Sequence, residues 1–162
     1  LALSQQADIK LPYSQVNPYA FEPAIAPHLA AEQVGETISL TVIESQFAAM
    51  RLQADAVVVE GAGGWLVPLN DQQTIADLAK ALKLPVVLVV AIKLGCINHA
   101  LLTVQAIADS GLNLVGWVAN DFLDDSQSTA IIQSLKQRIT APCLGIVPRL
   151  AQDEDASAYL TL

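Results

Sequence analysis

The fold class follows from one stretch, Leu84-Pro-Val-Val-Leu-Val-Val-Ala-Ile92, together with Lys93-Leu-Gly-Cys-Ile-Asn-His99 directly after it. The first nine residues are apolar and mostly β-branched and show no polar alternation, which is typical of a parallel strand that is buried on both faces. Residues 96–110 have the apolar spacing of an amphipathic helix, and Gly111 suits the position just after its end. The stretch therefore predicts one buried strand followed by one helix.

The same unit recurs along the chain. The spacing predicts further helices at Leu1–Ala7, Pro27–Gln33, Thr37–Gln53, Thr74–Lys83 and Ser126–Ile139, and further strands at Ala56–Glu60, Leu112–Ala119 and Cys143–Val147. For the helix at residues 74–83, Asp71 or a neighbour is the expected N-terminal cap. Alternating helices and buried strands predict an α/β fold with four parallel strands. Ligands of such sheets bind beyond the carboxyl ends of the strands.

Composition narrows the class of protein further. The chain has 162 residues, which suits a single domain over residues 1–162, and 53% of them are hydrophobic. The net charge of −8 argues against a nucleic-acid or anionic-membrane partner. The longest apolar run has nine residues, too few for a membrane-spanning helix. The two cysteines, Cys96 and Cys143, form no disulfide framework, so we expect a cytoplasmic protein.

The first strand end carries an acid followed by glycines, Glu60-Gly-Ala-Gly-Gly-Trp65. A carboxylate that closes an apolar strand can hold a metal ion in the ligand crevice, and the glycines let the backbone approach a ligand. The alternative is a Gly-rich turn after an ordinary strand. A dinucleotide fingerprint is excluded, because Leu66 stands where its third glycine is required.

Three other strand ends carry weaker signals. At Lys93–His99 a turn opens into a helix whose N-terminus can bind an anion. The alternative for Lys93 is a solvated charge, and His99 alone is better explained as a locally packed residue. Asn120 can present a donor and an acceptor to a purine edge, but the spacing alone favours an Asx turn. Residues 148–150, Pro-Arg-Leu, could form a wall beside a planar ring. No Gly-Lys dipeptide occurs, so these residues contain no phosphate-binding P-loop.

Taken together, these strand ends closely resemble dethiobiotin synthetases. The matching strings are Val59-Glu-Gly-Ala-Gly-Gly-Trp65, Lys93-Leu-Gly-Cys-Ile-Asn-His99, Gly116-Trp-Val-Ala-Asn-Asp121, Gly145-Ile-Val-Pro148, Val16-Asn-Pro-Tyr19 and Pro27-His28. The resemblance runs in order along essentially the whole chain. It implies a parallel sheet of P-loop NTPase type with helices on both faces. It also implies a ligase of biotin biosynthesis that uses ATP and Mg²⁺ to make dethiobiotin from 7,8-diaminopelargonate and CO₂.

The resemblance also assigns roles to individual residues, though no catalytic side chain. Glu60 would help to hold Mg²⁺. The nucleotide would be bound by Glu60, Gly61, Ala62, Gly63, Asn120, Asp121, Pro148, Arg149, Leu150 and, on a looser match, Asp155. The carboxylate of 7,8-diaminopelargonate would bind at Leu94, Gly95, Cys96, Ile97 and Asn98, across a homodimer interface.

The chain departs from the family's pattern at its start. The family's P-loop, a following lysine and an aspartate metal ligand precede the residues that match Leu1–Leu3. We therefore expect these 162 residues alone to be inactive and marginally stable, with an exposed apolar sheet edge where N-terminal strands are missing. One alternative is a degenerate domain that only dimerises or binds adenine nucleotide. Another is an amidoligase such as the cobyrinate-amidating enzymes, although these are longer and lack the string at residues 93–99.

Overall fold

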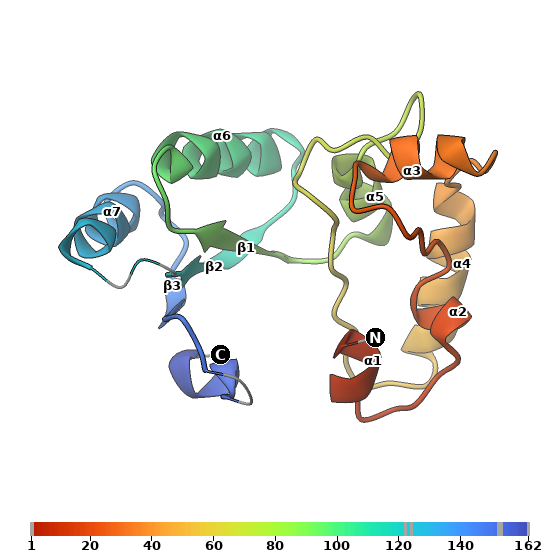
Figure 1. Cartoon of the computed structure of the whole chain (residues 1–162), viewed down its shortest axis with the longest axis horizontal. Helices are drawn as coiled ribbons and strands as arrows, with labels where there is room; N and C mark the ends of the chain where they lie inside the picture. Colours follow the sequence, from red (N-terminus) through yellow and green to blue (C-terminus); the bar gives the residue numbers. More distant parts are fainter. Residues whose placement is uncertain (1, 122, 124, 152–153, 162) are drawn as a thin grey trace. The chain divides into compact units, whose positions relative to one another are not determined.

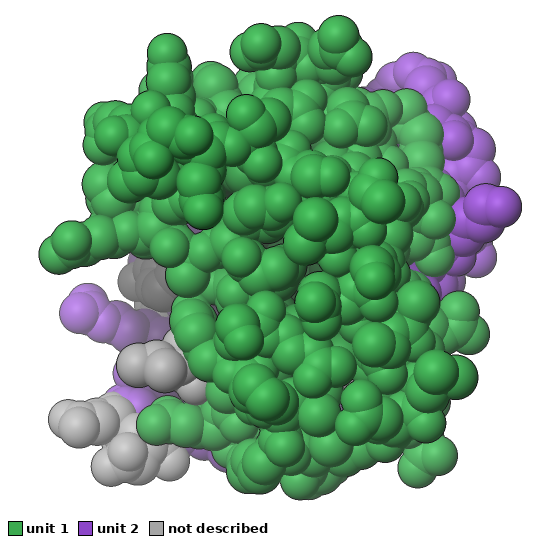
Figure 2. Space-filling view, turned by 90° about the vertical axis from the view of Figure 1, so that its right-hand side faces the viewer, with its two compact units in different colours: residues 1–82 green, residues 83–162 purple. Residues whose placement is uncertain are grey.

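The computed structural model describes residues 2–121, 123, 125–151 and 154–161. The chain divides into two compact units, unit 1 at Leu1–Leu82 and unit 2 at Lys83–Leu162, which are green and purple in Figure 2. The expectation of one domain over residues 1–162 stays a prediction.

Unit 1 is helical in its described residues. Its helices are α1 (Ala2–Gln6), α2 (Tyr13–Val16), α3 (Pro27–Gln33), α4 (Leu40–Arg51) and α5 (Ile75–Leu82) (Figure 1). All four helices predicted in this half are confirmed, apart from Leu1, which lies outside the described residues, and small differences at the ends. The short helix α2 was not predicted, because four prolines in residues 12–27 obscure the helical spacing.

The prediction of a strand at Ala56–Glu60 is wrong. These residues have no regular secondary structure, and the side chain of Val58 is 91% exposed. A parallel strand is defined by hydrogen bonds to its neighbours, and the described residues of unit 1 form no strand that could supply them. The described sheet therefore has three strands instead of the four expected.

Unit 2 contains this sheet. Its elements are β1 (Val86–Ala91), α6 (Cys96–Asp109), β2 (Leu114–Asn120), α7 (Ser126–Lys136), β3 (Cys143–Val147) and the 3₁₀ helix η1 (Ala156–Tyr159). The strand order is β1-β2-β3, and both pairs are parallel. The parallel α/β class is confirmed, because each pair of consecutive strands is joined by a crossover that contains one helix, α6 between β1 and β2 and α7 between β2 and β3.

The core of unit 2 lies on one face of the sheet. Trp117 is fully buried and packs with Val90 of β1 and with buried residues of α6 and α7, such as Ala100 and Leu135. Side chains alternate along a strand, so Val89 and Val118 lie on the opposite face. On that face Val89 is 60% exposed, and β1 is an end strand of the described sheet. This face of the end strand therefore exposes an apolar side chain.

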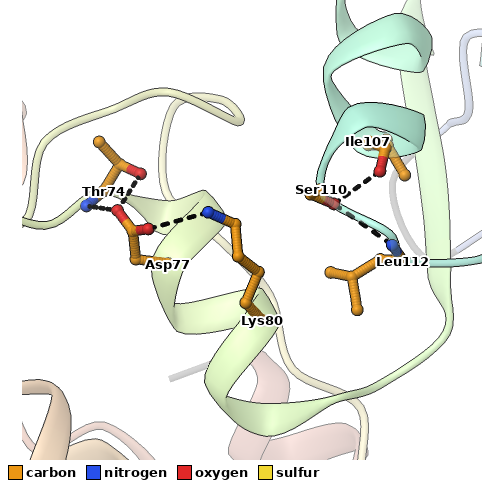
Figure 3. A network of polar contacts seen from close by, with 6 residues as sticks. All are labelled: Thr74, Asp77, Lys80, Ile107, Ser110 and Leu112. Carbon is orange, nitrogen blue, oxygen red and sulfur yellow. Dashed lines mark hydrogen bonds and ion pairs between the residues drawn. The ribbon is translucent and has the colours of Figure 1, made fainter.

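Polar side chains define where α5 begins and α6 ends. In α5 the carboxylate Oδ2 of Asp77 accepts hydrogen bonds from the backbone N and the Oγ1 of Thr74, at 2.9 and 2.8 Å (Figure 3). Thr74, and not Asp71, is thus the N-terminal cap. After α6, Ser110 Oγ donates to the carbonyl of Ile107 at 2.6 Å (Figure 3). Gly111, predicted as the residue just after this helix, follows in the left-handed conformation that favours glycine.

Candidate functional site

A hollow of about 610 Å³ opens at the carboxyl ends of β2 and β3. This size lies within the range of small-molecule sites. Its lining residues are Val89, Val118, Asn120, Val147, Pro148, Arg149, Leu150 and Ala156. All of them belong to unit 2, and the three valines come from the sheet face opposite the helices. The hollow therefore combines an apolar surface with a few polar groups at one end of the sheet.

Asn120 enters the hollow because of its position in the strand. It is the last residue of β2, and it lies on the same face as Val118 because the two are two residues apart. Its backbone is held on both sides, since it pairs with Ala91 of β1 and Val147 of β3 and its carbonyl accepts from Ile92 N at 2.9 Å. A rigid backbone thus presents a side-chain amide with one acceptor oxygen and two donor hydrogens.

The side chain of Asp121, the next residue, contacts the backbone of the residues that follow it. It is only 5% exposed, and its Oδ1 accepts a hydrogen bond from Leu123 N at 3.0 Å. This contact is an Asx turn, the alternative that the spacing favoured at this strand end, but it is made by Asp121 and not by Asn120. Asp121 does not line the hollow.

The wall at Pro148–Leu150 follows β3 directly, and a C-terminal segment lies against the same strand. Thr161 N donates to the carbonyl of Leu144 at 2.7 Å, and Leu160 forms an isolated β-bridge with Gly145. Gly145 is required by this close approach, because a Cβ at that position would lie 2.2 Å from the Tyr159 carbonyl oxygen. This docking carries η1 to the hollow, where its first residue, Ala156, contributes to the lining.

Asp155 stands next to this lining as the cap of η1. Its carboxylate accepts from Ser157 Oγ at 2.5 Å and from Ser157 N at 2.9 Å, and these bonds lower the pKa of Asp155 below its ordinary value. Arg149, in contrast, is an exposed cation of the wall. Among the described residues, the ion pair is the one between Asp77 and Lys80 in α5, and Arg149 takes no part in it.

The segment Glu60–Gly63 belongs to unit 1 and has no regular structure. Glu60 is exposed. The glycines are packed closely, since a Cβ at Gly61 would lie 3.0 Å from Ile75 Cγ2 and one at Gly63 would lie 3.1 Å from Val67 Cγ2. Among the described residues, no group of three or more His, Cys, Asp or Glu side chains could hold a metal ion. Glu60 is thus a single carboxylate beside a tight turn.

The turn before α6 exposes its backbone and the side chains of Leu94 and Asn98, and it buries the side chain of Cys96. Gly95 is the N-terminal cap residue, with φ at +87°, and no side chain caps this end of the helix. Leu94 is 99% exposed, whereas Cys96 is 4% exposed and belongs to the core, against which Ile97 also packs. A ligand at Leu94–Asn98 would therefore meet backbone N–H groups and the exposed Asn98, and it would not meet the thiol.

Among the proposed nucleotide residues, the structure gathers Asn120 and Pro148–Leu150 in one hollow. Sequence reasoning missed Val89, Val118, Val147 and Ala156, which complete the lining. Alternation along β2 could have identified Val118 from Asn120. The positions of Val89, Val147 and Ala156 depend on strand register and on how the C-terminal segment docks. Neither property can be predicted from the spacing of residues along the chain.

Comparison with known proteins gives one consistent result. A family model described as an AAA domain matches residues 2–157. The ATP-dependent dethiobiotin synthetase BioD of Cellvibrio japonicus (strain Ueda107) is 55% identical over 166 residues, which cover 100% of this chain and 72% of that protein. BioD of Pseudomonas aeruginosa (strain UCBPP-PA14) is 51% identical, with 100% and 73% covered. BioD 1 of Yersinia pestis is 47% identical, with 96% and 65% covered.

Among the described residues, no helix is both long enough and apolar enough to span a bilayer.

Proposed function

We infer the function of this chain from the family to which it belongs, the ATP-dependent dethiobiotin synthetases. The chain accordingly belongs to a family of ligases of biotin biosynthesis. We propose that this ligase closes the ureido ring of dethiobiotin from 7,8-diaminopelargonate and CO₂, at the expense of ATP. In this proposal the described hollow of unit 2 binds the adenine ring.

The observation that carries this assignment is the meeting of Asn120 with Pro148–Leu150 around an apolar surface. Adenine has two apolar faces and an edge with both a donor and an acceptor. The valines and the proline wall suit the faces, while the amide of Asn120 suits the edge, since an amide pairs with adenine through two hydrogen bonds. Arg149 adds a cation that can stack on the ring or approach the phosphates.

The proposed reaction has three steps. One amine of 7,8-diaminopelargonate adds to CO₂ and loses a proton, which gives a carbamate. A carbamate oxygen then attacks the γ-phosphorus of ATP, and ADP leaves. The second amine attacks the carbamoyl carbon and loses a proton, phosphate leaves, and the ureido ring is closed. Catalysis of phosphoryl transfer is mostly positioning and charge neutralisation, so the task of this chain's residues is to bind and orient.

The proposed Mg²⁺ would neutralise charge on the phosphates. Mg²⁺ is usually held by one or two carboxylates, several waters and the phosphates themselves, so a single exposed carboxylate is a suitable donor. Glu60 is the residue that would hold it. The described residues do not form a cage of protein ligands, and this type of site does not require one.

We further propose that the substrate carboxylate binds the backbone at Leu94–Asn98, in a homodimer. The long helix α6 presents a positive dipole end there, without a capping side chain. Leu94 is 99% exposed, which suits a position that a second protomer would cover. Both cysteines are free, which fits the reducing cytoplasm where we place the reaction.

The test is an assay of the protein from the complete reading frame that contains these residues. We expect dethiobiotin to form only when ATP, bicarbonate and 7,8-diaminopelargonate are all present. Asn120→Ala should raise KM for ATP about tenfold, the effect of roughly 1.4 kcal/mol, and leave KM for 7,8-diaminopelargonate unchanged. Asn113→Ala, an exposed asparagine just before β2, is the matched control.

Two results would contradict the proposal. If no combination of substrates gives dethiobiotin, while ATP still binds, the chain only binds adenine nucleotide. If dethiobiotin forms but Asn120→Ala leaves KM for ATP unchanged, the hollow is not where the adenine ring binds. Replacing 7,8-diaminopelargonate by other amine acceptors separates this reaction from an amidoligase activity.

A further inference from the structure

A bridging carboxylate lies beside the hollow and has no part in the reaction proposed above. Glu154 Oε2 accepts a hydrogen bond from Ala151 N at 3.0 Å, and its Oε1 accepts one from Tyr159 OH at 2.6 Å. Ala151 directly follows the wall at Pro148–Leu150, and Tyr159 is the last residue of η1. One side chain therefore links the end of the wall to the helix whose first residue lines the hollow.

The other side of this bridge is anchored to the sheet. The backbone of Tyr159 approaches β3 so closely that only glycine is accommodated at position 145, and Thr161 N is bonded to the Leu144 carbonyl at 2.7 Å. The start of the wall is anchored as well, because Val147 pairs with Asn120 in the sheet. The wall is thus held at its first end by β3 and at its second end through Glu154.

We propose that Glu154 and Tyr159 are positioning residues of the nucleobase site. Their hydrogen bond holds the wall at a set distance from Asn120, so that the nucleotide meets a preformed hollow. The inference rests on the proposed function, because it assumes that the hollow binds the adenine ring. It assigns neither residue to direct contact with the nucleotide.

The physical reason is preorganisation. A loop that is free in the unbound protein must be ordered when ligand binds, and this cost lowers the affinity. An O–H donor on an ionised carboxylate makes a short and strong hydrogen bond. The same bond lowers the pKa of Glu154 and raises the pKa of Tyr159, so the carboxylate stays ionised and the phenol stays protonated across the neutral range.

The experiment measures steady-state kinetics of the complete protein and its Glu154→Ala, Tyr159→Phe and doubly substituted variants. We expect KM for ATP to rise about three- to tenfold in each single variant, the range of one hydrogen bond. Because both substitutions remove the same link, the double variant should be little worse than Glu154→Ala. KM for 7,8-diaminopelargonate should stay unchanged.

Two further variants separate positioning from a general loss of stability. Glu154→Gln can still accept from Ala151 N through its oxygen and donate to the Tyr159 oxygen through its NH₂ group, so it should restore most of the ATP affinity. Glu32→Ala removes an exposed carboxylate from α3 and should leave all parameters unchanged. Hydrogen exchange at the Ala151 amide should be faster in Glu154→Ala and close to wild type in Glu154→Gln.

The outcomes are distinguishable. Unchanged exchange at Ala151 in Glu154→Ala overturns the inference, because the bridge then does not hold the wall. Faster exchange with an unchanged KM for ATP also overturns it, because the wall then does not serve the nucleotide. If the wild-type protein makes no dethiobiotin, the proposed function fails. ATP binding by calorimetry then decides the inference: weaker binding to Glu154→Ala supports it, and equal or absent binding overturns it.

Discussion

Residues 56–60 and strand β2 have similar sequences and different structures. Both are short, mostly apolar stretches that contain valines, three in succession at Val57–Val59 and two separated ones in β2, and both precede polar groups suited to a ligand. In β2, Trp117 is fully buried and the strand is bonded to a neighbour on each side, whereas Val58 is 91% exposed and its segment has no strand partner within unit 1. A stretch that contains valines therefore forms a strand only where neighbouring strands accept and donate its backbone hydrogen bonds and where neighbouring elements bury its side chains.

The same contrast extends to the candidate site. At the end of β2, paired backbone on both sides sets the position of Asn120, and β3 places the wall beside it. At the end of residues 56–60, Glu60 is exposed on a segment without such pairing. The nucleobase end of the proposed site is thus built by the sheet, while the position of Glu60 is not. This difference can be tested by pairs of substitutions, one in unit 1 and one in unit 2, whose effects on stability are compared.

The largest expected difference in stability is between substitutions at two hydrophobic residues, the buried Trp117 and the exposed Val58. Trp117→Ala should lower the free energy of unfolding of unit 2 by about 3–5 kcal/mol, because it leaves a cavity among buried residues. Val58→Ala should change the free energy of unfolding of unit 1 by less than about 0.5 kcal/mol, because the side chain is exposed. Urea unfolding followed by far-UV circular dichroism measures both. A large loss in Val58→Ala would show that residues 56–60 are buried in solution.

Next come two glycines that differ in what a Cβ would meet. Gly145→Ala should destabilise the protein by about 2 kcal/mol or more, since the new methyl group would press on the backbone carbonyl of Tyr159 at 2.2 Å. Gly61→Ala should cost below about 1 kcal/mol, because the nearest atom is a side-chain methyl of Ile75 that can move. Equal losses in urea unfolding would mean that the C-terminal segment does not dock on β3.

Two helix caps should have smaller effects. Asp125→Ala in unit 2 removes the acceptor for Gln127 N and Ser128 N at the start of α7, and should cost about 1 kcal/mol. Thr74→Ala in unit 1 should cost somewhat less, about 0.5–1 kcal/mol, because Asp77 keeps its bond to the Thr74 backbone N. Thermal unfolding of both variants checks the order, and a larger loss in Thr74→Ala would contradict it.

The smallest expected effect is a change of folding stability with pH, which is caused by Asp77 in the first turn of α5. Hydrogen bonds from the backbone and side chain of Thr74, and then from Lys80, lower the pKa of Asp77 below its ordinary value of 3.8. The native state thus holds this proton less tightly than the unfolded state, so the stabilisation is present above pH 4 and is lost as the pH falls through the lowered pKa. Asp77→Asn should flatten the fall in stability between pH 5 and pH 2. Asp71→Asn, which leaves the cap intact, should not.

Much of the secondary structure could be predicted from the sequence, because it depends on local spacing. Three of the four predicted strands, all the predicted helices and the role of Gly111 at the end of α6 follow from apolar periodicity and end signals. The carboxyl ends of the parallel strands indicated where to look for a site, but the nucleotide role of Asn120 and Pro148–Leu150 was implied by the resemblance to dethiobiotin synthetases and not by spacing. Long-range pairing is not local, so the failure at residues 56–60 could not be seen in the residues themselves.

By itself, the sequence determined the parallel α/β class, the family and the residue types at the strand ends, because these depend on composition, order and spacing. Only the tertiary structure decided that Asp121 makes the Asx turn while Asn120 faces the hollow, and that Cys96 is buried in the core. It also decided that Glu154 joins Ala151 to Tyr159. These contacts depend on strand register and on the docking of distant segments, which packing sets and local preference does not.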